Sequence, residues 1–485
     1  MSNVPRGVTC SGEGPRRARW NDRPDDDLRQ IEMTLETTSW SSRSPAPAFS
    51  RVPEIEPVYR RGNAMRGNIR RMKRVAVVAY AAGLVAARAV SAGGGADRAP
   101  VLGVVYGNSD QLVRLDPLTL QRLGSRSLTI PSFAYWDQSP NGSRIVFGGR
   151  AGTLRFVDPV KLEVVGTVPL QGFSDPRLAW VSPHALLIVD QASIAMVDPV
   201  AMRVRWRKTL PAAVRPFFPE RVARTPSGLV FLLAPIDGSV GATTLVSADV
   251  SGRVRSVVLG QIQSGATQVS PSESLFTGAE PGLAVDPVGN TAFVVGGDQT
   301  VATVDLATLA VAYHDPTRTL AHAEKVLAGP TREAAWLGSG LLAVTGENDN
   351  AWLDSNKAYQ ESVQPAGLTI VDTRTWTSRL VDAGTSSVTF NDGLLLATGE
   401  SWDTTAGSSA SKPIGNGLSA YTPAGALAFH VLGKTPFQQV VVASGTAYAL
   451  GAVATSVVKL PSGAILNTVK VSRPGSTPTP LIEYP

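Results

Sequence analysis

From residue 101 to its end, the sequence repeats a pattern of four short strands. The clearest copy runs from Gly282 to Val311 and reads GLAVDPVGNTAFVVGGDQTVATVDLATLAV. Turn-forming residues divide it into four predicted strands, at Leu283–Val285, Thr291–Val295, Thr300–Val304 and Leu309–Ala312. Across the copies, the third strand ends at one equivalent position, which is occupied by Asp116, Asp158, Asp198, Asp249, Asp305, Asp372, Thr422 and Leu460. Four-stranded units at this spacing predict an all-β propeller of about eight blades, with seven as the alternative.

The recurring aspartate is followed by a short turn. Proline comes next in LVRLDPLT at Leu112, LRFVDPVK at Leu154 and IAMVDPVA at Ile194. Asp followed by Pro suits the first two positions of a type I turn, so we interpret these aspartates as turn formers and not as ligands.

The two ends of the repeat region are complementary. The first unit has only three strands of its own, and the segment from Pro480 to Tyr484 reads as one further strand. We expect this segment to pair with the first unit as its innermost strand, which closes the ring and leaves no open sheet edge there.

These copies, together with LTIVDTRT at Leu368, resemble the YVTN-type repeats of bacterial surface β-propellers. The resemblance covers most of residues 101–485 and implies the propeller fold. For function it implies two classes, because that family contains lactonase-like enzymes as well as binding proteins. Several units depart from the family pattern by losing its Asp-Gly turn, and later units carry insertions. A second segment, Val197 to Trp206, resembles the tryptophan-docking repeat of quinoprotein dehydrogenases, but only this unit carries the tryptophan convincingly.

The sequence before the repeats has the pattern of an export signal. Lys73 and Arg74 precede an apolar stretch from Val75 to Ala87, and Val90-Ser91-Ala92 offers the small residues that a signal peptidase requires. We therefore expect a signal peptide at 72–92, with an uncleaved anchor or a buried helix as alternatives. The apolar stretch would span about 20 Å as a helix, which is short of a hydrocarbon core of about 30 Å, so no stable membrane anchor is expected. Residues 1–71 read as a disordered leader upstream of the true start, 93–100 as a linker and 101–485 as the propeller.

Charge and cysteine content exclude several classes of function. Residues 1–92 hold 16 of the 45 basic and 9 of the 39 acidic residues, which leaves 29 and 30 for the rest of the chain. A nearly neutral repeat region argues against binding to nucleic acid, which requires a basic surface. The single cysteine, Cys10, lies in the leader, so the propeller can contain no disulfide and no thiolate nucleophile.

The long connections all fall on one face of the predicted ring. We name the four strands of each unit a to d in chain order. Because consecutive strands run in opposite directions, the turns between strands b and c lie on the same face of the ring as the crossovers from strand d to strand a of the next unit. The long b–c loops are Glu347–Ala366 and Gly399–Gly417, and the long crossovers are Gln261–Pro281 and Asp315–Thr331. All four belong to units four to seven, and loops of this length in compact domains are usually functional or disordered.

Candidate binding residues follow from these segments. Both b–c loops begin with Thr-Gly-Glu and then combine acidic residues with tryptophan, and His314 and His322 flank one crossover. Acidic oxygens suit Ca²⁺ and exposed tryptophan suits a sugar or a protein, although solvated loops with tryptophans folded back onto the rim give the same pattern. The candidate ligand-binding residues are Glu347, Asp349, Trp352, Asp354, Glu400, Trp402, Asp403, His314 and His322.

The sequence contains no H-E-x-x-H and no G-x-S-x-G motif. We therefore predict a secreted, non-enzymatic, monomeric binding scaffold for a protein or carbohydrate ligand, located outside the cell or in its envelope. No cofactor is expected, apart from Ca²⁺ as a weaker alternative. The second hypothesis is a lactonase-like or other hydrolytic enzyme on the same face, with His314, His322, Glu347 and Asp349 near its site. Trp136, Trp180 and Trp336, at the ends of innermost strands, are expected to pack between blades.

Overall fold

The computed structural model describes part of the chain, and its described residues form strands and turns. They are 100–105, 110–130, 135–149, 152–173, 176–190, 193–210, 214–215, 221–235, 240–270, 275–316, 328–353, 359–403, 413–451, 454–470 and 479–483. The predicted leader, signal peptide and linker, up to residue 99, lie outside this part. None of the described residues belongs to an apolar helix of membrane-spanning length.

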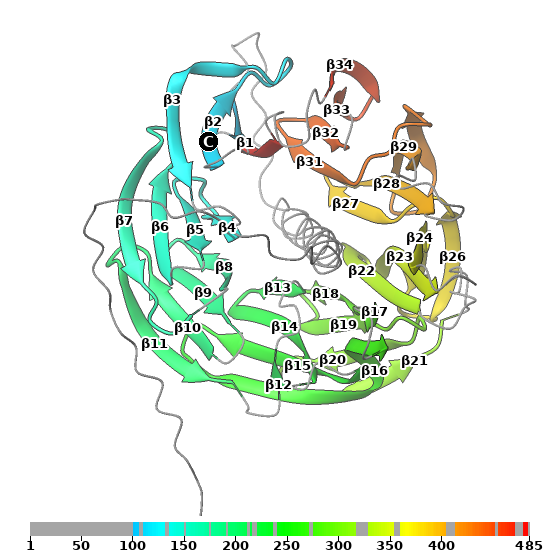
Figure 1. The fold of residues 1–485 in the computed structure, drawn as a ribbon. Helices are drawn as coiled ribbons and strands as arrows, with labels where there is room; N and C mark the ends of the chain where they lie inside the picture. Colours follow the sequence, from blue (N-terminus) through cyan, green and yellow to red (C-terminus); the bar gives the residue numbers. More distant parts are fainter. Residues whose placement is uncertain are drawn as a thin grey trace, which may run out of the picture. The chain divides into compact units, whose positions relative to one another are not determined.

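The strands pair into four-stranded antiparallel meanders, which we number as blades in chain order (Figure 1). Blade 1 consists of β35 (Thr479–Glu483), β1 (Val101–Val105), β2 (Asp110–Leu115) and β3 (Arg122–Ile130). Blade 2 consists of β4 (Tyr135–Gln138), β5 (Ile145–Gly149), β6 (Thr153–Asp158) and β7 (Glu163–Pro169). Blade 3 consists of β8 (Arg177–Ser182), β9 (Ala185–Val189), β10 (Ser193–Asp198) and β11 (Arg203–Thr209). Blade 4 consists of β13 (Val222–Thr225), β14 (Gly228–Pro235), β15 (Gly241–Asp249) and β16 (Val254–Ser270). Blade 5 consists of β18 (Gly282–Asp286), β19 (Thr291–Val295), β20 (Val301–Asp305) and β21 (Val311–His314). Blade 6 consists of β22 (Ala328–Gly338), β23 (Leu341–Leu353), β25 (Leu368–Asp372) and β26 (Thr377–Asp382). Blade 7 consists of β27 (Ser387–Asn391), β28 (Leu394–Asp403), β29 (Ile414–Tyr421) and β30 (Leu427–Val431). Blade 8 consists of β31 (Gln439–Ala443), β32 (Thr446–Leu450), β33 (Ala454–Lys459) and β34 (Ala464–Lys470). Three further strands, β12 (Val214–Arg215), β17 (Leu275–Ala279) and β24 (Tyr359–Pro365), pair with these meanders.

Apolar clusters fill the space between successive blades. One such cluster joins Phe156 of blade 2 to Trp180 of blade 3, and another joins Val113 of blade 1 to Val457 of blade 8. The innermost strand of blade 1 is the C-terminal β35, which pairs antiparallel with β1, the pairing that the sequence predicts. The expected all-β propeller class is therefore confirmed. The expected packing of the three tryptophans is confirmed as well, since Trp180 is fully buried and Trp136 and Trp336 pack against neighbouring clusters.

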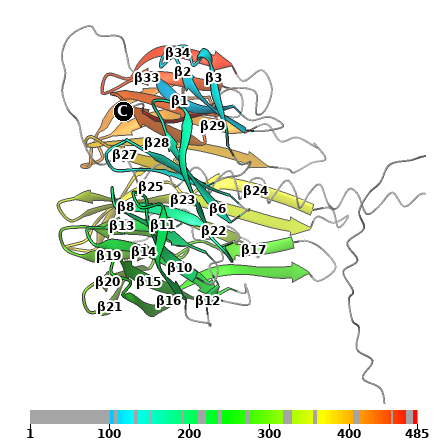
Figure 2. The same ribbon diagram turned by 90° about the vertical axis from the view of Figure 1, so that its left-hand side faces the viewer.

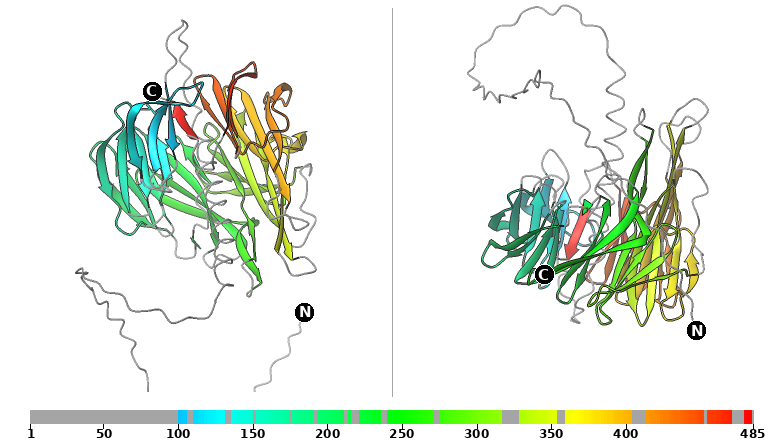
Figure 3. Two further views of the ribbon diagram at one scale, coloured as in Figure 1. Left: turned by 45° about the horizontal axis from the view of Figure 1, so that its top comes forward. Right: turned by 90° about the horizontal axis from the view of Figure 1, so that it is seen from below.

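Two of the four long segments form strand hairpins where the sequence predicted loops, and the other two are described only near their ends. Gln261–Pro281 continues β16 and returns as β17, and Glu347–Ala366 continues β23 and returns as β24. Figures 2 and 3 show these extended strands running past the ends of the shorter strands on one side. The physical reason is that their polar residues lie on strands whose backbone groups pair with one another, so high polarity did not mean irregular structure.

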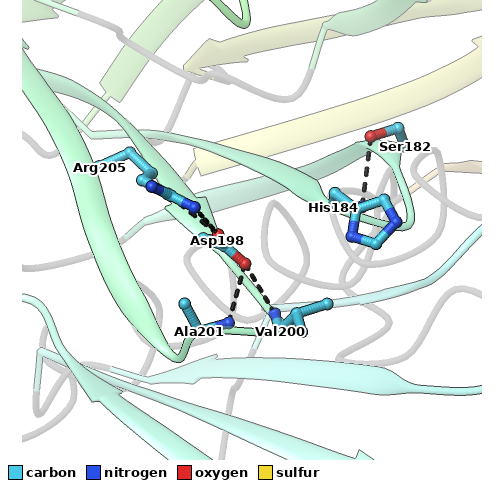
Figure 4. A network of polar contacts seen from close by, with 6 residues as sticks. All are labelled: Ser182, His184, Asp198, Val200, Ala201 and Arg205. Atoms are coloured by element: carbon cyan, nitrogen blue, oxygen red, sulfur yellow. Dashed lines mark hydrogen bonds and ion pairs between the residues drawn. The ribbon is translucent and has the colours of Figure 1, made fainter.

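The aspartate at the end of each third strand organises the turn that follows. In blade 3, Asp198 Oδ1 accepts hydrogen bonds from the amides of Val200 and Ala201, both at 2.9 Å, and its other oxygen accepts from Arg205 (Figure 4). These bonds, that from the Ala201 amide foremost, lower the pKa of Asp198 to about 2. Asp116, Asp158 and Asp305 accept the same pair of amide bonds. The interpretation of these aspartates as turn formers is confirmed.

The fourth residue after the aspartate has a left-handed backbone although it is not glycine. Leu120, Leu162, Met202, Leu309 and Trp376 have φ values between 51° and 62°. The amide of this residue closes the turn on the aspartate carbonyl, for example at 2.9 Å in Leu162. Its side chain is inserted between blades, where Leu162 is only 3% exposed. Burial of a large side chain thus offsets the strain of the positive φ.

The same turn receives a contact from the outermost strand of the preceding blade. Trp206 Nε1 donates to Val250 O at 3.0 Å, Arg255 donates to Ala307 O at 2.6 Å and Arg379 donates to Ala424 O. The remaining junctions use the Arg126–Glu163 ion pair, Met202 against Gly166, the stacked His314 and Trp376 rings, Phe429 against Gly463, and Asn467 Nδ2 donating to Leu118 O at 2.8 Å. We call these contacts the turn latches. The last one joins blade 8 to blade 1 on the outer side, as β35 does on the inner side.

We predict that replacing a buried leucine by glycine or by alanine lowers the unfolding free energy in a different order at a latch turn than in a strand. Leu162→Ala should cost about 2–4 kcal/mol of unfolding free energy, because it removes a buried leucine. Leu162→Gly should cost no more than that, since glycine relieves the strain at positive φ. At the control position Leu154, buried in β6, glycine should instead be worse than alanine by about 0.5–1 kcal/mol. Urea unfolding measures all four variants, and the same ranking at both positions would contradict the account.

Removal of residues 480–485 should lower the stability of the propeller. The truncated chain loses the backbone hydrogen bonds between β35 and β1, which leaves β1 as an open edge. Thermal unfolding followed by circular dichroism should show a lower midpoint than that of a control truncated after Glu483. Equal midpoints would mean that β35 does not close the ring.

Candidate functional site

The described parts of the four long segments are linked to one another by backbone pairing, and we call them the extension layer (residues 261–270, 275–281, 328–332, 346–353, 359–365 and 399–403). β22 pairs with β23 as far as Ala328 and Asn350, and β23 pairs with β24 from Glu347 to Leu353. β24 then pairs with β28 of the next blade through Val363 and Trp402. At the other end, Glu280 and Thr331 form a parallel bridge between blades 5 and 6. Blades 5, 6 and 7 are thus tied together by backbone hydrogen bonds on this face, in addition to packing.

Four of the predicted site residues lie on one face of the extension layer. Directly opposed residues in a sheet share a face, and alternate residues of a strand do so too. Asp349 is opposite Val363, which is opposite Trp402, and Glu347 and Glu400 are each two residues away on the same strands. Strand register therefore places Glu347, Asp349, Glu400 and Trp402 on one face, although they are up to 55 residues apart in sequence.

Glu400 is the most enclosed of these residues, with 6% exposure. Its Oε1 accepts a hydrogen bond from Gln438 Nε2 at 2.9 Å, whereas Oε2 has no hydrogen-bond partner among the described residues. Trp402, Glu347 and Asp349 are half-buried. This face thus combines three carboxylates with one indole that is partly open to solvent, a combination that can accept hydrogen bonds and stack against a flat ligand.

The other predicted site residues lie elsewhere or cannot be assessed. The backbone of Asp403 is opposite Ser362 and that of Trp352 is opposite Gln360, but their side chains are not among those described. Asp354 and His322 lie outside the described residues. Among described residues no group of three or more His, Cys, Asp and Glu side chains has the arrangement that holds a metal ion. Binding of Ca²⁺ stays a prediction.

His314 is part of a turn latch and not of the extension layer. Its ring stacks on Trp376 with 3.6 Å between ring centroids, and Nε2 lies 3.3 Å from Thr303 Oγ1. Burial lowers the pKa of His314, which favours the neutral ring. These contacts place it between blades 5 and 6. The hydrolytic hypothesis stays a prediction.

A second group of polar residues, which the sequence analysis missed, lies on the innermost strands. We call Arg221, Glu280, Glu333 and Ser387 the inner cluster; they come from blades 4, 5, 6 and 7. Arg221 Nη2 is 3.9 Å from Glu280 Oε2, and Ser387 Oγ donates to Glu333 Oε2 at 3.3 Å. Burial raises the pKa of both glutamates above the ordinary 4.5, although Arg221 opposes the rise in each case.

A signal for this cluster does exist in the sequence. Glu333 stands three residues before Trp336 and directly follows Arg332, so two charged residues adjoin on one innermost strand. Charged residues are rarely enclosed unless they are paired, so this pair is an exception to the apolar repeat pattern.

Comparison with known proteins assigns this chain to no family. No protein-family model and no curated protein matches the sequence. Among solved structures, the chain is similar to dihydro-heme d1 dehydrogenase NirN in complex with DHE, with 12% identity over 78% of this chain and 74% of that one, and a TM-score of 0.48. It is also similar to BamB from Moraxella catarrhalis, with 14% identity over 69% of this chain and 87% of that one, and a TM-score of 0.41. At these scores neither structure carries an argument about the site, and the resemblance to YVTN-type repeats stays a resemblance of fold.

The pH dependence of stability tests the burial of Glu333. Because its pKa is raised in the folded state, its contribution to stability is fully present below pH 4.5 and is lost as the pH rises through the raised value. Glu333→Gln cannot ionise and escapes this loss, so we expect the variant to be more stable than the natural protein at about pH 8 and to lose that advantage near pH 4.5.

The matched control for this experiment is Asp198→Asn. The pKa of Asp198 is lowered from 3.8 to about 2, so its contribution is present above pH 3.8 and is lost as the pH falls toward 2. Urea unfolding across both ranges should show effects of opposite direction. A Glu333→Gln variant that is less stable than the natural protein at about pH 8 would mean that attraction to Arg221 outweighs burial.

Proposed function

We propose that this protein is an exported, non-enzymatic binding scaffold, which holds a protein or carbohydrate ligand on the extension layer. The observation that carries the proposal is the pairing of β24 with β28, which links the elaborated segments of two blades into one surface. A propeller needs no such pairing for its own stability, because its blades are already joined by apolar clusters and turn latches. Export is proposed from the leader, so that the mature chain begins at Gly93.

The composition of the layer supports binding to a polar surface. Glu347, Asp349 and Glu400 share by strand register the face of the sheet that carries Trp402. On the adjoining strand, Pro365 is half-buried on this same face, opposite Glu347. A rigid sheet that presents side chains in fixed positions loses little entropy when it binds, which favours affinity.

Site-specific photocrosslinking in the cells that export the protein tests this function. A benzoylphenylalanine residue at Pro365 samples the face of the extension layer that carries Glu347 and Trp402. The matched control is the same residue at Val288, which is 94% exposed in the short turn between β18 and β19 on the opposite side of blade 5. We expect a covalent adduct of larger mass from position 365 and none from position 288.

Trp402→Ala combined with the crosslinker at position 365 should reduce the adduct by about tenfold, while the melting temperature falls only slightly because the indole is half-buried. Mass spectrometry of the adduct distinguishes a protein from a carbohydrate. Equal adducts from positions 365 and 288, or none from either, would contradict the proposal.

A further inference from the structure

Charge is distributed unevenly around the ring. Residues 101–260, which supply most of blades 1 to 4, carry 17 basic and 11 acidic residues, whereas residues 261–485 carry 11 basic and 18 acidic residues. The first half of the ring therefore has a formal net charge of +6 and the second half a formal net charge of −7. Such an asymmetry in a nearly neutral chain favours a partner that responds to local charge, because the attraction depends on the patch that faces the partner and not on the whole chain.

The positive charge is concentrated on one outermost strand. β11 reads RVRWRKT, so four of its seven residues are basic and none is acidic. Arg205 pairs with Asp198, and Arg207 lies over the Phe173 ring. Arg203 and Lys208 are exposed, and neither forms an ion pair with another described residue. Two cations of this strand can therefore contact a negatively charged partner.

Exposed valines accompany these cations at equivalent positions of blades 2 and 3. Val160 and Val200 are each the second residue after the turn aspartate, and Val164 and Val204 are each the sixth. The exposed fractions of the four side chains range from 37% to 58%. The fold does not require valine at either position, because blade 6 has an arginine and a serine there. Turns favour polar residues, so repeated exposed valines in neighbouring blades indicate an apolar contact surface.

A turn latch joins the valines of the two blades. Met202 of the blade 3 turn lies against Gly166 of β7, where a Cβ would come within 2.7 Å of the methionine sulfur. Met202 stands two residues from both Val200 and Val204, and Gly166 stands two residues after Val164. The residues of this surface lie on the outer wall of the ring, to which the outermost strands β7 and β11 belong (Figure 1). We call it the valine rim, and it consists of Val160, Val164, Val200, Arg203, Val204 and Lys208.

The valine rim combines two requirements that few partners meet together. Its valines gain free energy when they leave water for an apolar phase, and its two unpaired cations gain when they approach negative charge. Nucleic acids and acidic polysaccharides meet only the second requirement. The surface of an anionic lipid bilayer meets both, because the phosphates lie directly above the acyl chains.

We propose that the valine rim docks the propeller on the surface of an anionic lipid bilayer, with its valines among the lipid headgroups and with Arg203 and Lys208 on lipid phosphates. The rim lies on the turns between the third and fourth strands and on the strands that follow them. The extension layer grows from the opposite ends of the strands, so docking by the rim does not cover it. The proposal is independent of the function proposed for the extension layer.

Vesicle flotation of residues 93–485 tests the proposal. The predicted leader is left out because its own basic and apolar residues would bind vesicles, and the ring closes without it through β35 and β1. One set of vesicles contains phosphatidylcholine with about 30 mol% phosphatidylglycerol, and the other contains phosphatidylcholine alone. We expect the anionic vesicles to bind at least about tenfold more tightly, and this binding to weaken as the salt concentration rises. Residues 93–485 hold 29 basic and 30 acidic residues, so attraction by net charge alone predicts no binding.

A pair of charge variants assigns the binding to the rim. Arg203→Glu combined with Lys208→Glu should weaken binding to the anionic vesicles by at least about tenfold, because each cation near an anionic surface contributes about fivefold. Lys459→Glu combined with Lys470→Glu is the matched control, since it changes the net charge equally at two exposed residues that end β33 and β34 of blade 8. The control should bind within about twofold of the natural protein.

A third variant tests the apolar contact at constant charge. Val160→Ser combined with Val200→Ser should weaken binding to the anionic vesicles by about tenfold, because two exposed apolar side chains no longer enter the headgroup region. Both side chains are exposed in turns, so the melting temperature should change little. Circular dichroism confirms that all the variants are folded.

Absence of binding to the anionic vesicles would overturn the proposal, and so would equal losses from the blade 3 and blade 8 charge variants. Retention on heparin without binding to vesicles would identify an acidic polysaccharide as the partner instead. Self-association without vesicles that the blade 3 charge variant abolishes would show that the rim binds the acidic half of a second copy, which also contradicts the proposal. These outcomes leave the photocrosslinking experiment unaffected, because position 365 lies in the extension layer.

Discussion

The turn that follows each third strand is the element on which the ring most depends. Its aspartate satisfies the amides of the turn, its left-handed residue inserts a side chain between blades, and its carbonyls or side chains receive the latch from the preceding blade. One short segment thus ends a strand, fixes the direction of the next strand and sets the spacing to the neighbouring blade. This explains why the aspartate recurs while the latch varies among arginine, tryptophan, histidine, methionine, phenylalanine and asparagine: the latch needs only to reach the turn, by hydrogen bonding or by packing.

The variety of the latches also explains the limited resemblance to quinoprotein propellers. Trp206 docks on the following blade, with its Nε1 on Val250 O and its ring against Gly252. Other junctions reach the same place with Arg255 or Asn467. The tryptophan is therefore one solution to a packing requirement that all blades share, and it carries no implication of a quinone cofactor.

Sequence reasoning succeeded where the pattern is local and repeated. Strand alternation, the Asp turn and the orphan C-terminal strand predicted the class of fold and the pairing of β35 with β1. It failed where contacts are long-range. The pairing of β24 with β28 joins blades 6 and 7 through residues such as Val363 and Trp402, and nothing in either segment alone specifies the other. The inner cluster was missed for the same reason, since Arg221, Glu280, Glu333 and Ser387 are brought together only when four blades close around them.

The extension layer and the inner cluster lie on continuous strands. β22 carries Thr331 of the layer and Glu333 of the cluster, and Glu280 follows β17 directly. The central requirement of this account is that the layer is an ordered sheet anchored to the ring, and native-state hydrogen exchange measures it most directly. The account predicts that the amides of Glu347–Leu353 and Tyr359–Pro365 that donate within the sheet exchange nearly as slowly as those of Leu341–Val344 in the ring portion of β23. Exchange of those amides at the rate of unprotected peptide would contradict it.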